Sequence, residues 1–334
     1  MGLTKTIKSN KMKSMKKMSR REILKKGTLG ATGVAASTLF GANTLTAQEE
    51  NRKLFNSQLT AKTAFITGGA RGIGLAAAVE LAKAGINIVL FDIATEDIPH
   101  VGYKLSSESD LASAKKKIES LNVKCLAIKG DVRNIDDLKS AMQRTVDTFG
   151  SLDILVANAG VTQVGAIEEF SSKEIDVVYD INVAGIIKTT QVAAPFMKQQ
   201  KSGRMVFLSS ALGRMGNELF PVYASTKWAV IGFAKSAALT YGKDNITCNV
   251  VAPGLVRTKL ADNPYVLGKM MPNNPDATFD SVSETLKSGN PIPVGHLEPE
   301  DVAKAITLFV SDATNKVTGE VFDVSYGSLA RSMA

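Results

Sequence analysis

The sequence predicts a three-layer α/β fold, in which a doubly wound parallel β-sheet is covered by helices on both faces. From Thr63 onward, short runs rich in β-branched residues alternate with helical stretches, and nearly all of these runs are uniformly apolar. Strands buried on both faces have this composition, whereas strands with one wet face alternate between apolar and polar residues. The repeated order of strand and helix is typical of a single large α/β domain.

We expect seven strands, at Thr63–Thr67, Ile86–Asp92, Val123–Lys129, Leu152–Asn158, Arg204–Ser209, Asn245–Ala252 and Gly319–Ser325. The main helical stretches are Gly72–Ala84, Asn134–Phe149, Lys173–Gln199, Pro221–Tyr241 and Pro299–Ser311. Two connections, at 93–122 and about 259–297, are longer than the neighbouring elements need. Long segments after the carboxyl ends of parallel strands usually shape a ligand site. We therefore expect one domain over residues 61–330, with a lid at about 259–297.

The first strand is followed by a glycine-rich turn and then at once by a helix. The turn reads Thr67-Gly68-Gly69-Ala70-Arg71-Gly72-Ile73-Gly74. Its glycines let the backbone bend tightly and approach a pyrophosphate, and the helix N-terminus offers unpaired N–H groups. In this context the pattern predicts a Rossmann-type dinucleotide site, with Gly68, Arg71, Gly72, Ile73 and Gly74 at the cofactor.

Two charged residues near this turn indicate opposite cofactors. Asp92 closes the second strand, where a carboxylate can accept both ribose hydroxyls of an adenosine and repels a 2′-phosphate, which favours NAD. Arg71 could instead pair with a 2′-phosphate, which favours NADP. We give Asp92 the greater weight, because an unscreened carboxylate beside a phosphate is costly. NADP is the alternative.

Several further motifs follow the glycine turn in a fixed order. They are Asn158-Ala159-Gly160, Asn182, Ser210, Tyr223-Ala224-Ser225-Thr226-Lys227 and Pro253-Gly254. In this order and spacing, the chain from about Ala61 to Gly327 resembles the classical short-chain dehydrogenase/reductase family. The resemblance implies the strand order 3-2-1-4-5-6-7. It also implies an NAD-binding catalytic domain that interconverts an alcohol and a ketone.

The catalytic chemistry can be argued from Tyr223 and Lys227. These residues are four apart at the start of a helix, so they share one face. A lysine ammonium stabilises a nearby phenolate and lowers the tyrosine pKa from about 10 toward neutrality, which suits a general acid and base. By resemblance, Ser210 would bind the substrate oxygen, Lys227 would also hold the nicotinamide ribose, and Asn182 would position a water on the proton path.

The same resemblance implies further cofactor contacts. Asp131 and Val132 would cap the adenine, and Asn158, Ala159 and Gly160 would flank the cofactor. The residues expected beside the nicotinamide carboxamide are Pro253, Gly254, Val256 and Thr258. A catalytically silent nucleotide-binding protein is the alternative to an enzyme, and it is disfavoured because both Tyr223 and Lys227 are present.

The positive charge of the chain is concentrated before residue 48. Of the 40 basic and 32 acidic residues, ten basic ones and one acidic one lie there, so the remainder carries 30 basic and 31 acidic residues. A body this close to neutral predicts no nucleic-acid partner. The two cysteines and two histidines suggest no metal centre.

The basic leader contains Ser19-Arg20-Arg21-Glu22-Ile23-Leu24-Lys25, followed by a weakly apolar stretch from Gly27 to Ala47. This arrangement resembles a twin-arginine export signal, and it is too interrupted for a stable membrane span. We expect a signal over 1–47, a linker over 48–60 and a periplasmic protein. A disordered basic tail on a cytoplasmic protein is the alternative.

The connection after Asp92 includes Tyr103-Lys104-Leu105-Ser106-Ser107-Glu108-Ser109-Asp110-Leu111. It resembles the insert of the mycofactocin-associated branch of the family, in which NAD is held without exchanging. Combined with an export signal, this predicts a protein that folds around NAD and uses an external redox partner. The alternative is a surface loop and one ordinary helix, capped by Ser107–Asp110.

The lid segment is rich in apolar side chains, among them Leu260, Tyr265, Val266, Leu267, Met270 and Met271. Such a segment would cover a small apolar alcohol or ketone. A loop packed against the sheet is the alternative. The resemblance also implies a homodimer or homotetramer, formed through the helices at 173–199 and 221–241.

Overall fold

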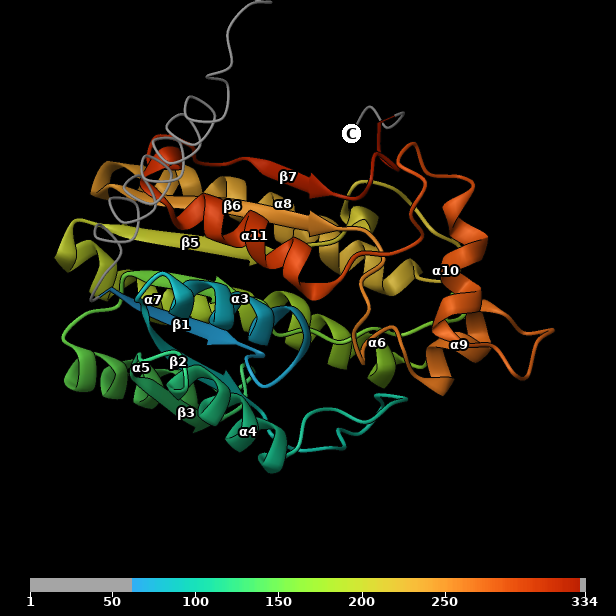
Figure 1. The fold of residues 1–334 in the computed structure, drawn as a ribbon, viewed down its shortest axis with the longest axis horizontal. Coiled ribbons are helices and arrows are strands. Elements are labelled where there is room, and N and C mark those ends of the chain that lie inside the picture. Colours follow the sequence, from blue (N-terminus) through green and yellow to red (C-terminus); the bar gives the residue numbers. More distant parts are fainter. Residues whose placement is uncertain (1–61, 331–334) are drawn as a thin grey trace, which may run out of the picture. The chain divides into compact units, whose positions relative to one another are not determined.

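The computed structural model describes residues 62–330, and the predicted signal and linker at 1–47 and 48–60 lie outside that part of the chain. Its strands are β1 Thr63–Thr67, β2 Asn87–Asp92, β3 Cys125–Lys129, β4 Ile154–Ala157, β5 Gly203–Leu208, β6 Ile246–Pro253 and β7 Val321–Val324. They pair in parallel, in the order β3-β2-β1-β4-β5-β6-β7 (Figure 1). The predicted sheet and its strand order are confirmed.

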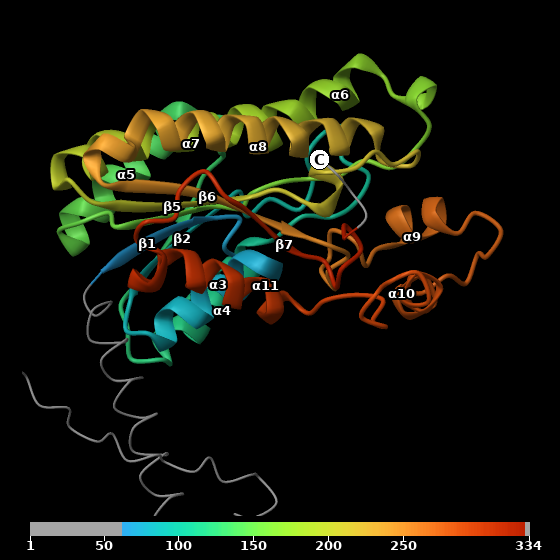
Figure 2. The ribbon, with the colours of Figure 1, turned by 90° about the horizontal axis from the view of Figure 1, so that it is seen from above.

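Helices cover both faces of this sheet (Figure 2). One layer contains α3 Gly72–Lys83, α4 Glu108–Glu119 and α11 Pro299–Val310, and the other contains α5 Ile135–Phe149, α7 Gly185–Gln200 and α8 Pro221–Tyr241. Every residue of β1, β4, β5 and β6 is buried, as their apolar composition requires. Because all strands are parallel, their carboxyl ends lie at one edge, where the segments after β1, β2 and β6 meet.

The stretch predicted as one helix over Lys173–Gln199 is interrupted in the structure. It contains α6 Ser172–Tyr179, a π-helical turn at Asp180–Ala184 and then α7. The π turn presents Asn182 to Val161, whose N–H and carbonyl both bond the Asn182 side-chain amide at 2.9 Å. This long-range contact accounts for the interruption, and π turns of this kind frequently occur at functional sites.

The two long connections contain helices of their own. The insert after β2 runs over the carboxyl edge and then forms α4, whose N-cap Ser107 and Asp110 make a capping box, as the sequence pattern indicates. The segment after β6 that is predicted to be a lid, at about 259–297, forms α9 Pro264–Met270 and α10 Phe279–Lys287. These helices share a small apolar cluster of Ala261, Leu267, Phe279 and Val282.

The two cysteines are buried and free. Cys125 begins β3 and Cys248 lies in β6, so β2, β1, β4 and β5 separate them in the sheet. Burial raises the pKa of each thiol to about 12. Among residues 62–330, no helix combines the length and hydropathy that crossing a membrane demands.

Candidate active site

The glycine turn between β1 and α3 is packed too closely for side chains. Gly68 has a φ of +66°, and a Cβ there would lie 2.9 Å from Asn158 Nδ2. A Cβ on Gly74 would lie 2.1 Å from the Gly68 carbonyl oxygen. Helix α3 begins at Gly72 with no side-chain cap and no acidic residue in its first turn. Its first N–H groups are therefore suited to an anion.

The turn borders a cavity of about 170 Å³ at the carboxyl edge of the sheet. The predicted cofactor residues that line it are Gly68, Arg71, Gly72, Ile73, Asp92, Asp131, Val132, Asn158, Ala159, Gly160 and Thr258. The insert forms another wall, with Ile98, Tyr103, Leu105 and Ser106. A cavity that joins a helix N-terminus to the ends of β1, β2 and β4 fits a dinucleotide. Gly74 lies behind this cavity, where its small size permits the tight turn.

Asp92 and Arg71, which favour opposite cofactors, are both tied to the insert. The Asp92 carboxylate is 5% exposed and accepts hydrogen bonds from the Ala70 N–H at 2.9 Å, the Ala94 N–H at 3.1 Å and the Ser106 hydroxyl. The Arg71 guanidinium donates to the Lys104 carbonyl at 2.9 Å. The insert thus orients the two side chains that bear on cofactor choice.

Three of the four predicted catalytic residues, Ser210, Tyr223 and Lys227, line a second cavity of about 330 Å³ next to the first, whereas Asn182 lines neither cavity. Ser210 follows β5, and its hydroxyl accepts a hydrogen bond from the Leu212 N–H at 3.1 Å. Tyr223 and Lys227 come from the first turns of α8, and the Lys227 ammonium lies 5.4 Å from the centre of the Tyr223 ring. The shared helix face is thereby confirmed. Pro253, Gly254, Val256 and Thr258 also line this cavity.

Burial dominates the protonation of both α8 side chains. It raises the pKa of Tyr223 to about 12, against the opposing effect of a hydrogen bond with Ser210. It lowers the pKa of Lys227 to about 8, and the ammonium donates to the Leu208 carbonyl at 2.9 Å. In the protein by itself the Tyr223 pKa is therefore displaced upward, opposite to the direction expected from Lys227 and the cationic nicotinamide. Burial of the phenolate is the dominant cause.

Asn182 lies buried beside the site and contacts the segment after β4. Its side-chain amide bonds Val161 at both ends and donates to the Thr226 hydroxyl at 3.2 Å. It is fully buried, and a Cβ on Gly160 would lie 3.2 Å from its oxygen. These contacts hold the Asn158–Val161 segment against the start of α8. Both N–H donors of the Asn182 side chain are engaged, so the side chain could bind a water of the proton path only through its oxygen.

A family model described as short chain dehydrogenase matches residues 62–265. The chain belongs to the short-chain dehydrogenase family. Among its relatives, (−)-trans-carveol dehydrogenase of Rhodococcus erythropolis is 30% identical, over 81% of this chain and 99% of the relative. The twin-arginine signal and the mycofactocin-type insert remain predictions.

Two solved structures of short-chain dehydrogenases resemble this one across the whole domain. Carveol dehydrogenase from Mycobacterium avium in complex with NAD has a TM-score of 0.79 at 30% identity, covering 81% of this chain and 98% of that one. A short chain dehydrogenase from Mycobacterium paratuberculosis bound to NAD has a TM-score of 0.75 at 34% identity, covering 81% and 99%.

The substrate side of this short-chain dehydrogenase is mostly apolar. The apolar side chains of the second cavity include Leu212, Met215, Phe220, Leu255, Leu260, Val266, Met270 and Leu286. Tyr326, which follows β7, also lines it and accepts a hydrogen bond from the Leu255 N–H at 3.0 Å. Sequence reasoning missed Tyr326, because no motif marks it, although it follows the last predicted strand directly.

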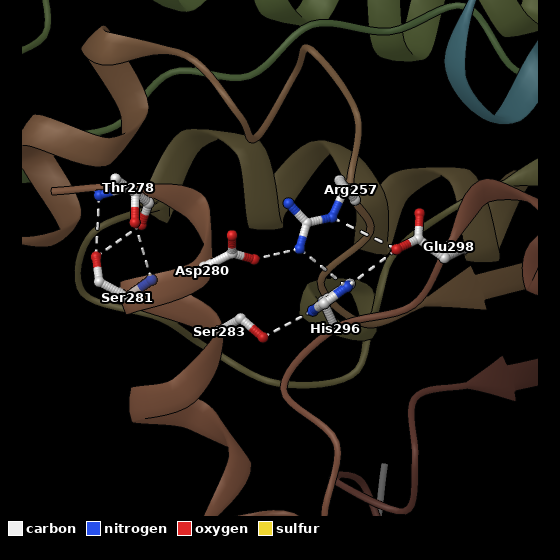
Figure 3. A network of polar contacts seen from close by, with 7 residues as sticks. All are labelled: Arg257, Thr278, Asp280, Ser281, Ser283, His296 and Glu298. Atoms are coloured by element: carbon white, nitrogen blue, oxygen red, sulfur yellow. Dashed lines mark hydrogen bonds and ion pairs between the residues drawn. The ribbon is translucent and has the colours of Figure 1, made fainter.

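A polar network fastens the lid of the dehydrogenase to the end of β6 (Figure 3). Arg257 forms ion pairs with Asp280 of α10 and with Glu298, and its guanidinium lies 4.5 Å from the Phe279 ring centre. His296 bonds the Ser283 hydroxyl at 2.7 Å through Nδ1 and Glu298 at 3.1 Å through Nε2. Helix α10 is thus contacted by Arg257, which precedes the predicted lid, and by His296, which lies at its end.

The insert and the lid also contact each other. The ring of Tyr103 stacks on that of Tyr265, with centres 6.5 Å apart. A Cβ on Gly102 would lie 2.7 Å from the Tyr265 ring, so only glycine permits this approach. The Tyr103 hydroxyl accepts a hydrogen bond from the Thr162 N–H at 3.0 Å, and burial raises its pKa strongly. The insert, which lines the first cavity, is therefore in contact with the segment that lines the second.

Proposed function

We propose that this protein is an NAD-dependent oxidoreductase that interconverts a small secondary alcohol and the corresponding ketone. The observation that carries the proposal is the convergence of Ser210, Tyr223 and Lys227 in one cavity, beside a tightly packed glycine turn at the N-terminus of α3. The family, in which carveol dehydrogenases are relatives, supports the same reaction class.

The setting of the adenosine end supports NAD rather than NADP as the cofactor. The Asp92 carboxylate lines that end of the cavity, and one donor of Arg71 is engaged by the Lys104 carbonyl of the insert. A 2′-phosphate would meet a carboxylate at close range, and Arg71 would be only partly available to pair with it. Both structural neighbours described above contain NAD.

The variant Asp92→Ala tests this cofactor assignment. We expect its NAD affinity to fall and NADP use to appear, because the repelling charge is gone. If steady-state rates with NADP stay at the wild-type level, Asp92 is not the discriminator. A wild type that itself turns over faster with NADP than with NAD would favour the alternative, an NADP-dependent carbonyl reductase of the same family.

The chain's own groups account for the proton transfer. When bound, NAD would supply the hydride acceptor for oxidation of the alcohol, and its reduced form the hydride donor for reduction of the ketone. The Ser210 hydroxyl holds the substrate oxygen, and Tyr223 takes the hydroxyl proton in oxidation and gives it back in reduction. The ammonium of Lys227 stabilises the tyrosinate, and the positive charge of oxidised nicotinamide acts in the same direction.

A small apolar substrate fits the second cavity. Its volume of about 330 Å³ lies within the usual range for small-molecule sites, and apolar side chains from the lid and the Leu212–Phe220 loop line it. Carveol, the substrate named for relatives, is itself a small secondary alcohol. We propose that residues 259–297 act as the substrate lid and that the enzyme works as a homodimer or homotetramer.

Export and cofactor retention belong together in this proposal. Free NAD is scarce outside the cytoplasm, so an enzyme carried there by a signal at 1–47 needs to bring its cofactor and pass electrons to an external redox partner. The insert contacts both the cofactor cavity and the lid, which supports slow release of a bound nucleotide.

The deciding experiment is to recover the full chain from the exported fraction, denature it and identify any released nucleotide by mass. Released NAD supports cofactor type, export and retention together. NADP would overturn the role given to Asp92. A protein that carries no nucleotide but binds added NAD would contradict only the hypothesis that NAD is retained, and the dehydrogenase assignment would stand. A protein that binds neither nucleotide and oxidises no secondary alcohol would be catalytically silent.

A further inference from the structure

The hydrogen bonds of Asp92 leave its carboxylate nearly saturated. A carboxylate offers about four lone-pair positions. At Asp92, Oδ1 accepts from the Ala94 N–H and the Ser106 hydroxyl, while Oδ2 accepts from the Ala70 N–H. One position on Oδ2 therefore stays open. An adenosine ribose presents two hydroxyls, so this carboxylate by itself can receive only one of them.

Ser106 has no proton to donate toward the cavity, but its oxygen can still accept hydrogen bonds. Its hydroxyl proton is committed to Asp92, and the side chain lines the same cavity although it is only 4% exposed. A hydroxyl oxygen has two lone pairs, and among the described residues no donor bonds that of Ser106. Toward the cavity, Ser106 is thus an acceptor with its own proton turned away.

The geometry points to Ser106 as the second half of the adenosine ribose site. One ribose hydroxyl donates to Asp92 Oδ2, and the other donates to the Ser106 oxygen. This inference rests on the proposed NAD-dependent function and assigns a binding residue that lies in the insert, outside the glycine turn and the strand ends.

The pair also acts against NADP in a second way. A 2′-phosphate can only accept hydrogen bonds at neutral pH, apart from a small protonated fraction. Asp92 and Ser106 together offer acceptors to that position and no free proton. The phosphate is therefore excluded for two reasons: the negative charge of Asp92 repels it, and neither side chain has a proton to donate to it. Ser106 lacks this proton because it donates it to Asp92.

The test measures nucleotide affinity by titration calorimetry, using the full chain freed of nucleotide. The ligands are NAD and its two analogues that lack either the 2′- or the 3′-hydroxyl of the adenosine ribose. The proteins are wild type, Ser106→Ala and the matched control Ser109→Ala, which changes an exposed serine in the first turn of α4. Ser106→Cys, which keeps the side-chain size, serves if the alanine variant unfolds.

We expect wild type and Ser109→Ala to lose about tenfold in affinity for each deoxy analogue, the loss of roughly one hydrogen bond. Ser106→Ala should bind NAD about tenfold more weakly and discriminate against only one of the two analogues. A general loosening of the insert would weaken all three ligands equally and would overturn the assignment, as would unchanged discrimination. Failure of wild type to bind NAD would overturn the proposed function itself.

Discussion

At the scale of single residues, the candidate site contains two groups whose pKa values burial displaces in opposite directions. Lys227 is 4% exposed, and burial lowers its pKa from 10.5 to about 8, while burial of Tyr223 raises its pKa to about 12. Sites that hold ionisable groups this way trade folding stability for chemistry. Lys227 should therefore be essential for turnover and costly for the fold.

The variant Lys227→Met tests whether Lys227 is required for activity while it lowers the stability of the fold. A pKa shift of this size corresponds to about 3 kcal/mol against the folded state, and losing the bond to the Leu208 carbonyl returns part of it. We expect activity to vanish while the free energy of unfolding rises by about 1–2 kcal/mol, a gain of a few degrees in Tm.

The pH dependence of this gain has a definite sign. Below pH 8 both folded and unfolded wild type carry the ammonium, and the full cost of burying it is present. Between about 8 and 10.5 the folded state loses the proton first, so the cost fades as pH rises. Chemical denaturation at pH 7 and pH 10 should show the gain shrinking, and an equal gain at both would contradict the assignment.

Motif residues such as Tyr223 and Lys227 could be located from the sequence, because a helix places positions four apart on one face whatever surrounds it. Ser106 and Tyr326 could not. Each reaches the site through the path of an irregular segment, and no periodicity of the chain encodes that path. The pKa direction of Tyr223 was also beyond sequence reasoning, since it depends on burial.

At the scale of elements, Arg257 contacts helix α10 of the predicted lid in two ways, through an ion pair with Asp280 and through stacking on Phe279. The stacking should contribute more than the exposed ion pair. Asp280 is 77% exposed, so its pair with Arg257 is screened by water. The stacking of Arg257 on Phe279 lies over the apolar cluster shared by α9 and α10. Arg257 should therefore hold α10 mainly through its contact with Phe279.

We expect Arg257→Ala to raise KM for the alcohol severalfold with a smaller change in kcat, because the lid closes less firmly over the substrate. Asp280→Ala, the matched control, should leave both parameters near wild type. Steady-state kinetics with saturating NAD measure both. Equal effects of the two variants would show that the exposed ion pair, and not the stacked guanidinium, fastens the lid.

The contact between insert and lid yields a separate prediction. In Gly102→Ala the new Cβ must displace the Tyr265 ring, so we expect KM for the alcohol and the dissociation constant for NAD to rise together. Gly268→Ala, on the same lid helix as Tyr265, meets nothing within 4 Å and should change neither. A rise in only one constant for Gly102→Ala would mean that the two cavities are not coupled there.

Most elements were predictable, and the exceptions share one cause. The uniform apolar runs located the strands to within about two residues. The π turn at Asp180–Ala184 was not foreseen, because it follows from contacts of Asn182 with Val161 and Thr226, far away in the sequence. The lid was predicted as a segment, but its short helices α9 and α10 depend on the cluster that they form together.

At the scale of the whole molecule, the parallel sheet explains why the motifs converge. Strand ends from β1, β2, β4, β5 and β6 lie along one edge, so residues far apart in the sequence, such as Gly68 and Thr258, border adjoining cavities. The sequence predicted this arrangement because burial on both faces leaves a distinct composition in each strand. Oligomeric state and export depend on surfaces and signals that this composition does not encode.

The separation of Cys125 and Cys248 in the sheet makes the enzyme indifferent to the redox state of its surroundings. Neither thiol can cross-link within the fold, and with pKa values near 12 neither forms the reactive thiolate at neutral pH. Thiol-reactive maleimide should label no cysteine in the native protein and both after denaturation, and native labelling would contradict this. The same folded chain would then survive in a cytoplasm rich in glutathione and in an envelope where disulfides form, without any oxidative maturation step.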